Sequence, residues 1–114
     1  MFPIFCSIVI PFRNEEENLK ILIPKLSNQI KNINYNCEVI FVDDYSSDNS
    51  AYIYQKNAHK FENSRLIRLT SRQGQTGAFK SAFKKAKGEF LIRMDADLQD
   101  DPDDLINFIE KFEK

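Results

Sequence analysis

Short continuous apolar runs alternate along the chain with stretches in which apolar residues recur every three or four positions. The continuous runs predict strands buried on both faces, over residues 6–12, 37–43, 66–69 and 90–94. The recurring pattern between them predicts helices. This alternation predicts an α/β fold with a parallel sheet in the strand order 3-2-1-4 and helices on both faces. Such sheets bind ligands beyond the carboxyl ends of their strands, so the residues that follow each strand are the candidate site residues.

The first predicted helix follows the first strand closely. Asn14 is expected to cap its free N–H groups, with Glu17 three residues later in a capping-box relation. Its apolar stripe consists of Leu19, Leu22, Leu26 and Ile33. Pro24 interrupts this stripe. Because proline lacks the N–H that a helix needs, we expect a kink or a shortened helix there.

Three further helices are predicted from the same periodicity. The apolar positions that mark them are Ala51, Tyr54, Ala58 and Phe61, then Phe79, Ala82, Phe83 and Ala86, then Leu105, Phe108, Ile109 and Phe112. A loop over residues 71–76 precedes the third helix, and Gly88 follows it as a left-handed stop. Asp101 and Pro102 predict the start of the last helix. The chain then ends without a closing signal, so we expect residues 1–114 to be the N-terminal part of a longer domain.

The composition restricts the class of protein. A chain of 114 residues with 42% hydrophobic residues is long enough for one domain with a buried core. Its formal charge of -1 argues against nucleic acid as a partner bound through a broad basic surface. Cys6 and Cys37 are too few for a disulfide framework or a zinc site, so we expect two reduced core thiols in a cytoplasmic protein. The apolar runs fall far short of the ~20 residues that span a bilayer.

The strongest candidates for chemistry are Asp95 and Asp97, at the end of the fourth predicted strand. In an extended chain, residues two apart point the same way, which directs both carboxylates, and Gln99 beyond them, to one side. Two like charges side by side are unfavourable unless a cation lies between them, and Mg²⁺ binds carboxylates together with phosphate oxygens. The pattern is compatible with a metal site at Asp95 and Asp97, although two carboxylates at this spacing are by themselves a weak signal for a metal. The alternative is a solvated acidic turn that caps the last helix.

Two other loops carry candidate residues. Asp44 follows the second strand, where a carboxylate can accept hydrogen bonds from a ribose or a base; the alternative is a turn that caps the next helix. Arg72 lies in a loop with Gly74 and Gly77, which can bring backbone N–H groups to a phosphate; the alternative is an ordinary flexible loop. His59, the only histidine, lies away from the strand ends, and we expect a structural role for it.

Three motifs occur in a fixed order, each at the end of a predicted strand. They are IVIPFRNEEENL at 8–19, VDDYSSD at 42–48 and DADLQDDP at 95–102. Together they resemble the family 2 glycosyltransferases of the GT-A fold, over nearly the whole chain. The LQDDP segment resembles in particular the branch that transfers sugars to dolichyl or polyprenyl phosphate. The resemblance implies a Rossmann-like fold that binds a nucleotide-diphospho-sugar.

The resemblance also implies roles for single positions. It implies a base pocket lined by Pro11, Arg13, Glu15, Val42 and Asp44, with an acceptor carboxylate at the last of these. Asp95 and Ala96 are implied to contact the ribose and phosphate, and Asp97 to hold Mg²⁺ or Mn²⁺ on the diphosphate with help from Gln99.

Two positions depart from the family pattern. Tyr45 stands where the family usually has glycine, so the turn after the second strand is expected to differ. Arg13 stands where lipid-phosphate mannosyltransferases tend to have tyrosine, which leaves the base and the sugar open.

The activity that the resemblance implies is inverting transfer of a sugar from a GDP- or UDP-sugar to a polyprenyl phosphate, or to a saccharide hydroxyl. No catalytic base is expected in this stretch. Acceptor-binding residues and any membrane helices are expected beyond it, so the stretch alone is expected to be inactive and the whole protein to act at the cytoplasmic face of a membrane. Two alternatives remain at this point: a non-catalytic α/β binding module and a flavodoxin-like nucleotide-binding domain.

Overall fold

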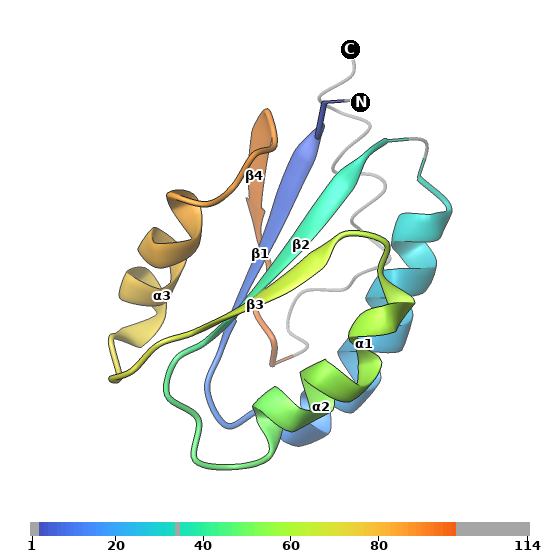
Figure 1. Cartoon of the computed structure of the whole chain (residues 1–114). Helices are drawn as coiled ribbons and strands as arrows, with labels where there is room; N and C mark the ends of the chain where they lie inside the picture. The colour runs from blue at the N-terminus through green and yellow to red at the C-terminus, as the bar shows by residue number, and fades with distance from the viewer. Residues whose placement is uncertain (1–2, 34, 98–114) are drawn as a thin grey trace.

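The computed structural model describes residues 3–33 and 35–97 (Figure 1). Its elements follow one another as β1 (Cys6–Phe12), α1 (Glu16–Lys31), β2 (Cys37–Asp43), α2 (Ser50–Asn57), the 3₁₀ turn η1 (Ala58–Lys60), β3 (Ser64–Arg68), α3 (Gly74–Phe83) and β4 (Phe90–Arg93). The strands form one sheet in the order β3-β2-β1-β4, and every neighbouring pair is parallel. This confirms the predicted topology. The predicted last helix and Gln99 lie outside the described residues.

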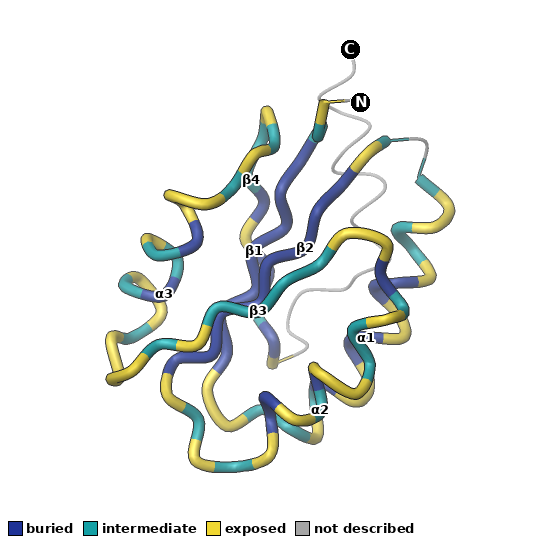
Figure 2. Tube along the Cα trace, viewed as in Figure 1, coloured by how far each residue is buried: buried dark blue, intermediate teal, exposed yellow. Residues whose placement is uncertain are grey.

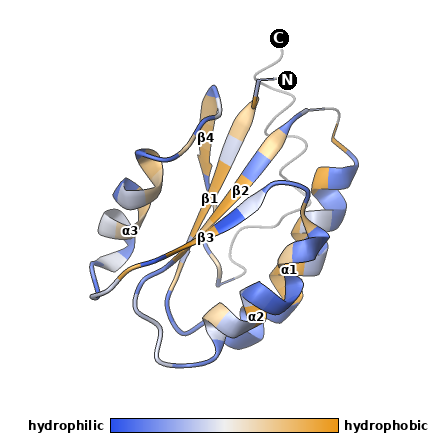
Figure 3. Cartoon of the chain, viewed as in Figure 1, coloured by the Kyte–Doolittle hydropathy of each residue, from blue (hydrophilic) through white to orange (hydrophobic). Residues whose placement is uncertain are grey.

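Helices cover both faces of the sheet, as predicted. α1 and α2 lie on one face and α3 lies on the other (Figure 1). Leu19, Leu22 and Leu26 of α1 pack with alternate residues of β1 and β2, such as Ile8 and Phe41. The second cluster consists of Val9, Ile40 and Val42 with Ala78 and Ala82 of α3. β1 and β2 are therefore buried on both faces, which explains their continuous apolar sequence (Figures 2 and 3).

The start of α1 differs from the prediction. The helix begins at Glu16, and Asn14 does not cap it, because Asn14 lies before the helix in a left-handed conformation with φ 54°. Pro24 does not shorten the helix either, which continues to Lys31. Pro24 and Lys20 lie on the exposed side, where water can bond the carbonyl group that the missing proline N–H leaves.

The limits of α2 and α3 also differ from those predicted from the sequence. α2 ends at Asn57, and η1 places exposed His59 outside the helix, while Phe61 beyond it is still buried in the core. α3 begins at Gly74, within the stretch that the sequence predicted as a loop. In the described part of the chain Gly74 is the glycine with positive φ, so the prediction of a left-handed stop at Gly88 is wrong.

The requirement for glycine at position 88 comes from a close approach. A Cβ atom there would lie 2.5 Å from the backbone nitrogen of Ser7 and 2.6 Å from the carbonyl carbon of Cys6. The Gly88 N–H also donates a hydrogen bond to Ser7 Oγ at 2.8 Å. The segment between α3 and β4 therefore packs directly against the backbone of β1.

Glu38 anchors the same segment and was not singled out from the sequence. Its side chain is buried, with 3% exposed, and it accepts hydrogen bonds from Ser7 Oγ at 2.5 Å and from the backbone N–H of Lys87 at 2.7 Å. Arg65 of β3 lies 3.4 Å from its other carboxylate oxygen. A buried carboxylate is tolerated when it is paired and hydrogen-bonded in this way.

The two cysteines lie side by side in the core. Cys6 and Cys37 are paired in the register of β1 and β2, and their sulfur atoms are 2.9 Å apart. Both are free and buried, as expected. None of the helices in the described residues is long and apolar enough to cross a bilayer.

Candidate functional site

A cavity of about 170 Å³ opens at the carboxyl edge of the sheet, where the loops after the four strands meet at the lower side of Figure 1. Its lining residues are Pro11, Phe12, Arg13, Glu15, Asp44, Arg72, Gly74, Gln75, Ala96 and Asp97. They follow or end β1, β2, β3 and β4, or begin α3. Parallel sheets bind their ligands at this edge, so this cavity is the candidate site.

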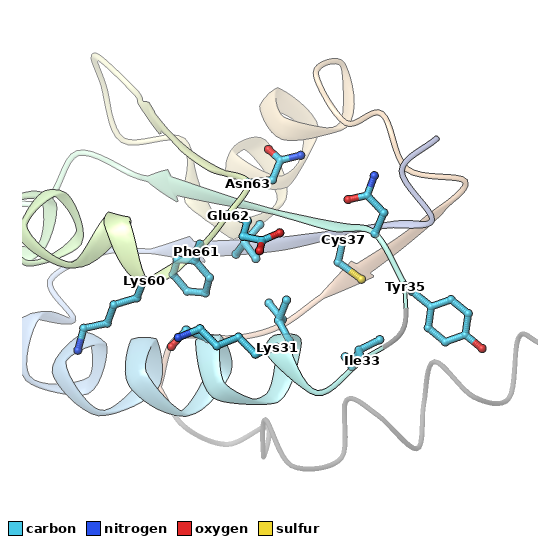
Figure 4. A pocket seen from close by; sticks show the side chains of 12 residues that line it. Lys31, Ile33, Tyr35, Cys37, Lys60, Phe61, Glu62 and Asn63 are labelled. Atoms are coloured by element: carbon cyan, nitrogen blue, oxygen red, sulfur yellow. The ribbon is translucent and has the colours of Figure 1, made fainter. Parts of the chain in front are cut away.

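A larger cavity of about 620 Å³ lies at the opposite edge of the sheet (Figure 4). It is lined by the end of α1 and the starts of β2 and β3, including Lys31, Cys37, Phe61 and Asn63. None of the site residues predicted from the sequence lies in it. Size alone therefore does not identify the site, and the position relative to the strand ends does.

Asn14 joins the β1–α1 and β2–α2 loops. Its side-chain oxygen accepts hydrogen bonds from the backbone N–H of Ser47 at 2.8 Å and of Asp48 at 3.3 Å. Its own backbone N–H donates to Ser46 Oγ at 2.9 Å. The left-handed conformation of Asn14 is one that asparagine tolerates better than most residues. These bonds fix the neighbours of Asn14 in sequence, Arg13 and Glu15, which line the cavity.

The first turn of α1 is capped by residues between β2 and α2 rather than by the residues that directly precede the helix. Asp48 accepts a hydrogen bond from the Glu16 N–H at 3.3 Å, and Ser50 Oγ accepts one from the Glu15 N–H at 2.9 Å. Partial burial raises the pKa of Asp48, but hydrogen bonds from Ser50 and from the Glu16 backbone outweigh it and leave the pKa below its ordinary value. This contribution to stability is present above the unfolded-state pKa and is lost as the pH falls through the folded-state pKa.

Asp44 organises the loop that carries Arg72. Asp44 is buried, and its two carboxylate oxygens accept hydrogen bonds from the N–H groups of Gln73, at 2.7 Å, and Gly74, at 2.8 Å. It therefore caps α3, a role that was not predicted from the sequence, in which the capping residues proposed for this loop were Ser47 and Asp48. Each oxygen of a carboxylate has a second lone pair, so Asp44 can accept a further bond from a ligand in the cavity.

Tyr45 follows Asp44 with φ 62°, the left-handed region in which glycine is favoured, and its side chain is exposed. This conformation costs a residue with a side chain about 1–2 kcal/mol. Glycine loses about 0.5–1 kcal/mol more backbone entropy on folding. Tyr45→Gly is therefore expected to raise the free energy of unfolding by about 0.5–1 kcal/mol in denaturant titrations. Tyr45→Ala keeps the strain and serves as the control, so an equal gain from both variants would contradict the assignment.

The chain after β4 departs from the extended geometry that the sequence favoured. β4 ends at Arg93, and residues 96–97 form a turn, so the alternation that would direct Asp95 and Asp97 alike does not continue. Asp97 is exposed and lines the cavity. Asp95 is not in the lining, and one of its carboxylate oxygens lies 3.7 Å from Arg93 Nε.

The structure brings together seven of the nine residues expected to bind the nucleotide-sugar. The two exceptions are Asp95 and Val42, whose side chain is in the core beside α3. Sequence reasoning did not single out Phe12 and Gln75 as lining residues, whereas Gly74 was predicted in the loop that carries Arg72. Phe12 ends an apolar strand like any core residue. Gly74 and Gln75 line the cavity because α3 begins at Gly74. The residue that determines this start is Asp44, 30 positions earlier in the chain, whose carboxylate accepts the Gly74 N–H.

The donor set of the cavity fits one hard divalent cation held together with a phosphate ligand. The lining contains two guanidinium groups, of Arg13 and Arg72, and three carboxyl groups, of Glu15, Asp44 and Asp97. A diphosphate would add further negative charge, which Mg²⁺ or Mn²⁺ would offset through carboxylate and phosphate oxygens. Within residues 3–33 and 35–97, no cluster of three histidine, cysteine or acidic side chains can hold a metal by itself. Of the three carboxylates that line the cavity, Asp97 is the exposed one.

Residues 7–114 match the model of the family described as glycosyl transferase family 2. Among curated proteins, the chain is 37% identical over 112 residues to the undecaprenyl-phosphate 4-deoxy-4-formamido-L-arabinose transferase of Pseudomonas fluorescens (strain SBW25), covering 96% of the chain and 33% of that protein. The enzyme of the same name from Yersinia enterocolitica is 38% identical, with 95% and 33% covered. The chain thus spans about a third of the length of these relatives.

Solved structures give the same fold. S. aureus TarS 1-349 in complex with UDP-GlcNAc superposes with a TM-score of 0.70 and 28% identity, covering 82% of this chain and 27% of that one. The mannosyltransferase PcManGT from Pyrobaculum calidifontis, in complex with GDP-Man and Mn²⁺, gives a TM-score of 0.70 and 25% identity, with 85% and 28% covered.

Proposed function

Because this chain belongs to glycosyl transferase family 2, we propose that it forms the nucleotide-sugar-binding part of an inverting glycosyltransferase whose acceptor is a polyprenyl phosphate. The observation that carries the proposal is the cavity at the carboxyl edge. It gathers residues of three separate motifs, 8–19, 42–48 and 95–102, around one space. Two structurally similar proteins bind UDP-GlcNAc and GDP-Man, respectively.

The charges of the cavity support a division of roles. Arg72 is an exposed guanidinium group that can bind the oxygens of a diphosphate, and Arg13, also exposed, is proposed to line the base pocket. Glu15 and Asp44 are acceptors for N–H groups of the base and hydroxyl groups of the ribose. Buried Ala96 is small and allows a ligand to approach the backbone beside Asp97.

Mg²⁺ or Mn²⁺ is the cofactor that we propose, with Asp97 as its protein ligand. Gln99 and Asp95 remain predicted ligands, the first outside the described residues and the second outside the cavity lining. When bound, the ion would neutralise charge on the departing diphosphate. The structurally similar mannosyltransferase contains Mn²⁺ together with GDP-Man.

The proposal of a phosphate acceptor rests on the names of the similar transferases. A polyprenyl phosphate is already anionic, so its oxygen needs no strong base to attack the anomeric carbon, whereas a saccharide hydroxyl needs one. The names of the relatives from Pseudomonas and Yersinia specify undecaprenyl phosphate. The whole protein is accordingly proposed to act at the cytoplasmic face of a membrane.

Calorimetric titration with UDP and with GDP tests the binding proposal. We expect one of them to bind at least about tenfold more tightly with Mn²⁺ or Mg²⁺ than with EDTA, because the cavity needs added positive charge to accept a diphosphate. The parent nucleoside is the control, since it has no phosphate and its affinity should not respond to metal. Equal affinity of the diphosphate with and without EDTA would exclude the metal role, and no binding of either diphosphate would leave the binding-module alternative.

A further inference from the structure

The positive charge of the chain is concentrated in one segment. Residues 65–88 contain seven of the sixteen basic residues and no acidic residue. Two of the seven are paired with buried carboxylates, Arg65 with Glu38 at 3.4 Å and Arg68 with Asp43 at 3.6 Å. A near-neutral net charge therefore conceals a strongly basic region around α3.

Four lysines of this segment are exposed on and just beyond α3. They are Lys80, Lys84, Lys85 and Lys87. Among the described residues, none of their ammonium groups lies within 4 Å of a carboxylate. Phe83 lies among them with 59% of its surface exposed, and helical spacing places it on the same side of α3 as Lys80. The inner side of α3 is occupied by Ala78 and Ala82 against the sheet.

We propose that this basic face, defined by the four lysines and Phe83, binds the surface of an anionic lipid bilayer. Exposed lysines attract the anionic headgroups of a bilayer, and a nearby exposed aromatic ring such as that of Phe83 can insert between the headgroups. The lysines attract the negative surface, and attraction of this kind is worth about fivefold in affinity for each lysine.

The position of α3 connects this surface with the candidate site. Gly74 and Gln75 begin the helix and line the cavity, while Phe83 ends it. A bilayer along the outer face of α3, the exposed outer turns in Figure 2, would therefore lie beside the mouth of the cavity. This inference rests on the proposed function in one respect, because it places the membrane that carries a lipid-phosphate acceptor next to the bound donor.

Sedimentation of the purified protein with vesicles tests the inference. Vesicles of phosphatidylcholine with phosphatidylglycerol, without any polyprenyl phosphate, separate membrane binding from sugar transfer. We expect binding to these vesicles, no binding to pure phosphatidylcholine, and a loss of at least about a hundredfold in affinity when the four lysines are changed to glutamine. Unchanged binding by this variant would overturn the inference.

Matched variants on the opposite face make the result specific. Lys20, Lys25, Lys31 and Lys56 are also exposed, on α1 and α2, and changing them to glutamine alters the net charge equally. Phe83→Ser is paired with Tyr52→Ser, since each ring is 59% exposed. We expect only the α3 variants to lose binding, with all variants keeping the circular dichroism and thermal midpoint of the parent. An equal loss from both sets, or binding of an RNA oligonucleotide but not of vesicles, would refute a lipid surface.

Discussion

Sugar transfer by the whole protein is expected to fall at least about a hundredfold when Asp97 is replaced by asparagine. Asp97 is the exposed carboxylate of the cavity after β4, where the proposed metal and the departing diphosphate would meet. A metal that stabilises a leaving group contributes several kcal/mol to the transition state, and each 1.36 kcal/mol changes the rate about tenfold. The measurement is kcat for transfer from the nucleotide-sugar that binds, at saturating Mn²⁺.

The control removes a charge that lies away from the cavity. Glu17→Gln changes a side chain that is 79% exposed on α1 and that, within residues 3–33 and 35–97, forms an ion pair with Lys20 alone, so the activity of this variant should stay close to that of the parent. An Asp97→Asn enzyme with parental kcat would show that the residues 95–97 form an acidic turn without a metal. Loss of activity with unchanged nucleotide affinity and unchanged metal response would assign Asp97 to a different role.

Patterns within single segments predicted the sheet and most of the cavity. β1 and β2 were predicted with their observed limits, because both are buried on both faces and their sequences contain little besides apolar residues. The strand order followed from the handedness of the crossovers. Since the carboxyl ends of parallel strands converge, Arg13, Asp44 and Asp97 were predicted to meet without any knowledge of side-chain contacts.

Contacts between distant segments explain the features that were not predicted from the sequence. Asn14 was expected to cap its own helix, but its side-chain oxygen bonds the N–H groups of Ser47 and Asp48 in the next loop. Asp44 similarly fixes where α3 begins, through the N–H group of Gly74. Such bonds leave no periodic pattern in either segment. A prediction from local propensity therefore assigns a capping residue such as Asn14 to the helix that follows it in sequence.

The largest effect on stability is expected at Gly88, where the sequence and the structure give different reasons for glycine. A left-handed stop is usually glycine but also accepts asparagine better than alanine. A close approach accepts neither asparagine nor alanine, because any Cβ would lie about 2.5 Å from the Ser7 nitrogen. We expect Gly88→Ala and Gly88→Asn each to lower the free energy of unfolding by about 3 kcal/mol, since the obstructing atoms belong to the backbone of a central strand and cannot move aside cheaply.

Gly74 provides the matched comparison within the same chain. Its φ is +78°, and no atom lies within 4 Å of the position that a Cβ would occupy, so its need for glycine is conformational alone. Gly74→Asn should therefore cost less than Gly74→Ala, because asparagine tolerates the left-handed region, whereas the two substitutions at Gly88 should cost the same. Unfolding in urea measures all four variants. A mild effect of Gly88→Asn together with a severe effect of Gly88→Ala would support the explanation by a left-handed stop. It would contradict the explanation by close packing of the α3–β4 segment on β1.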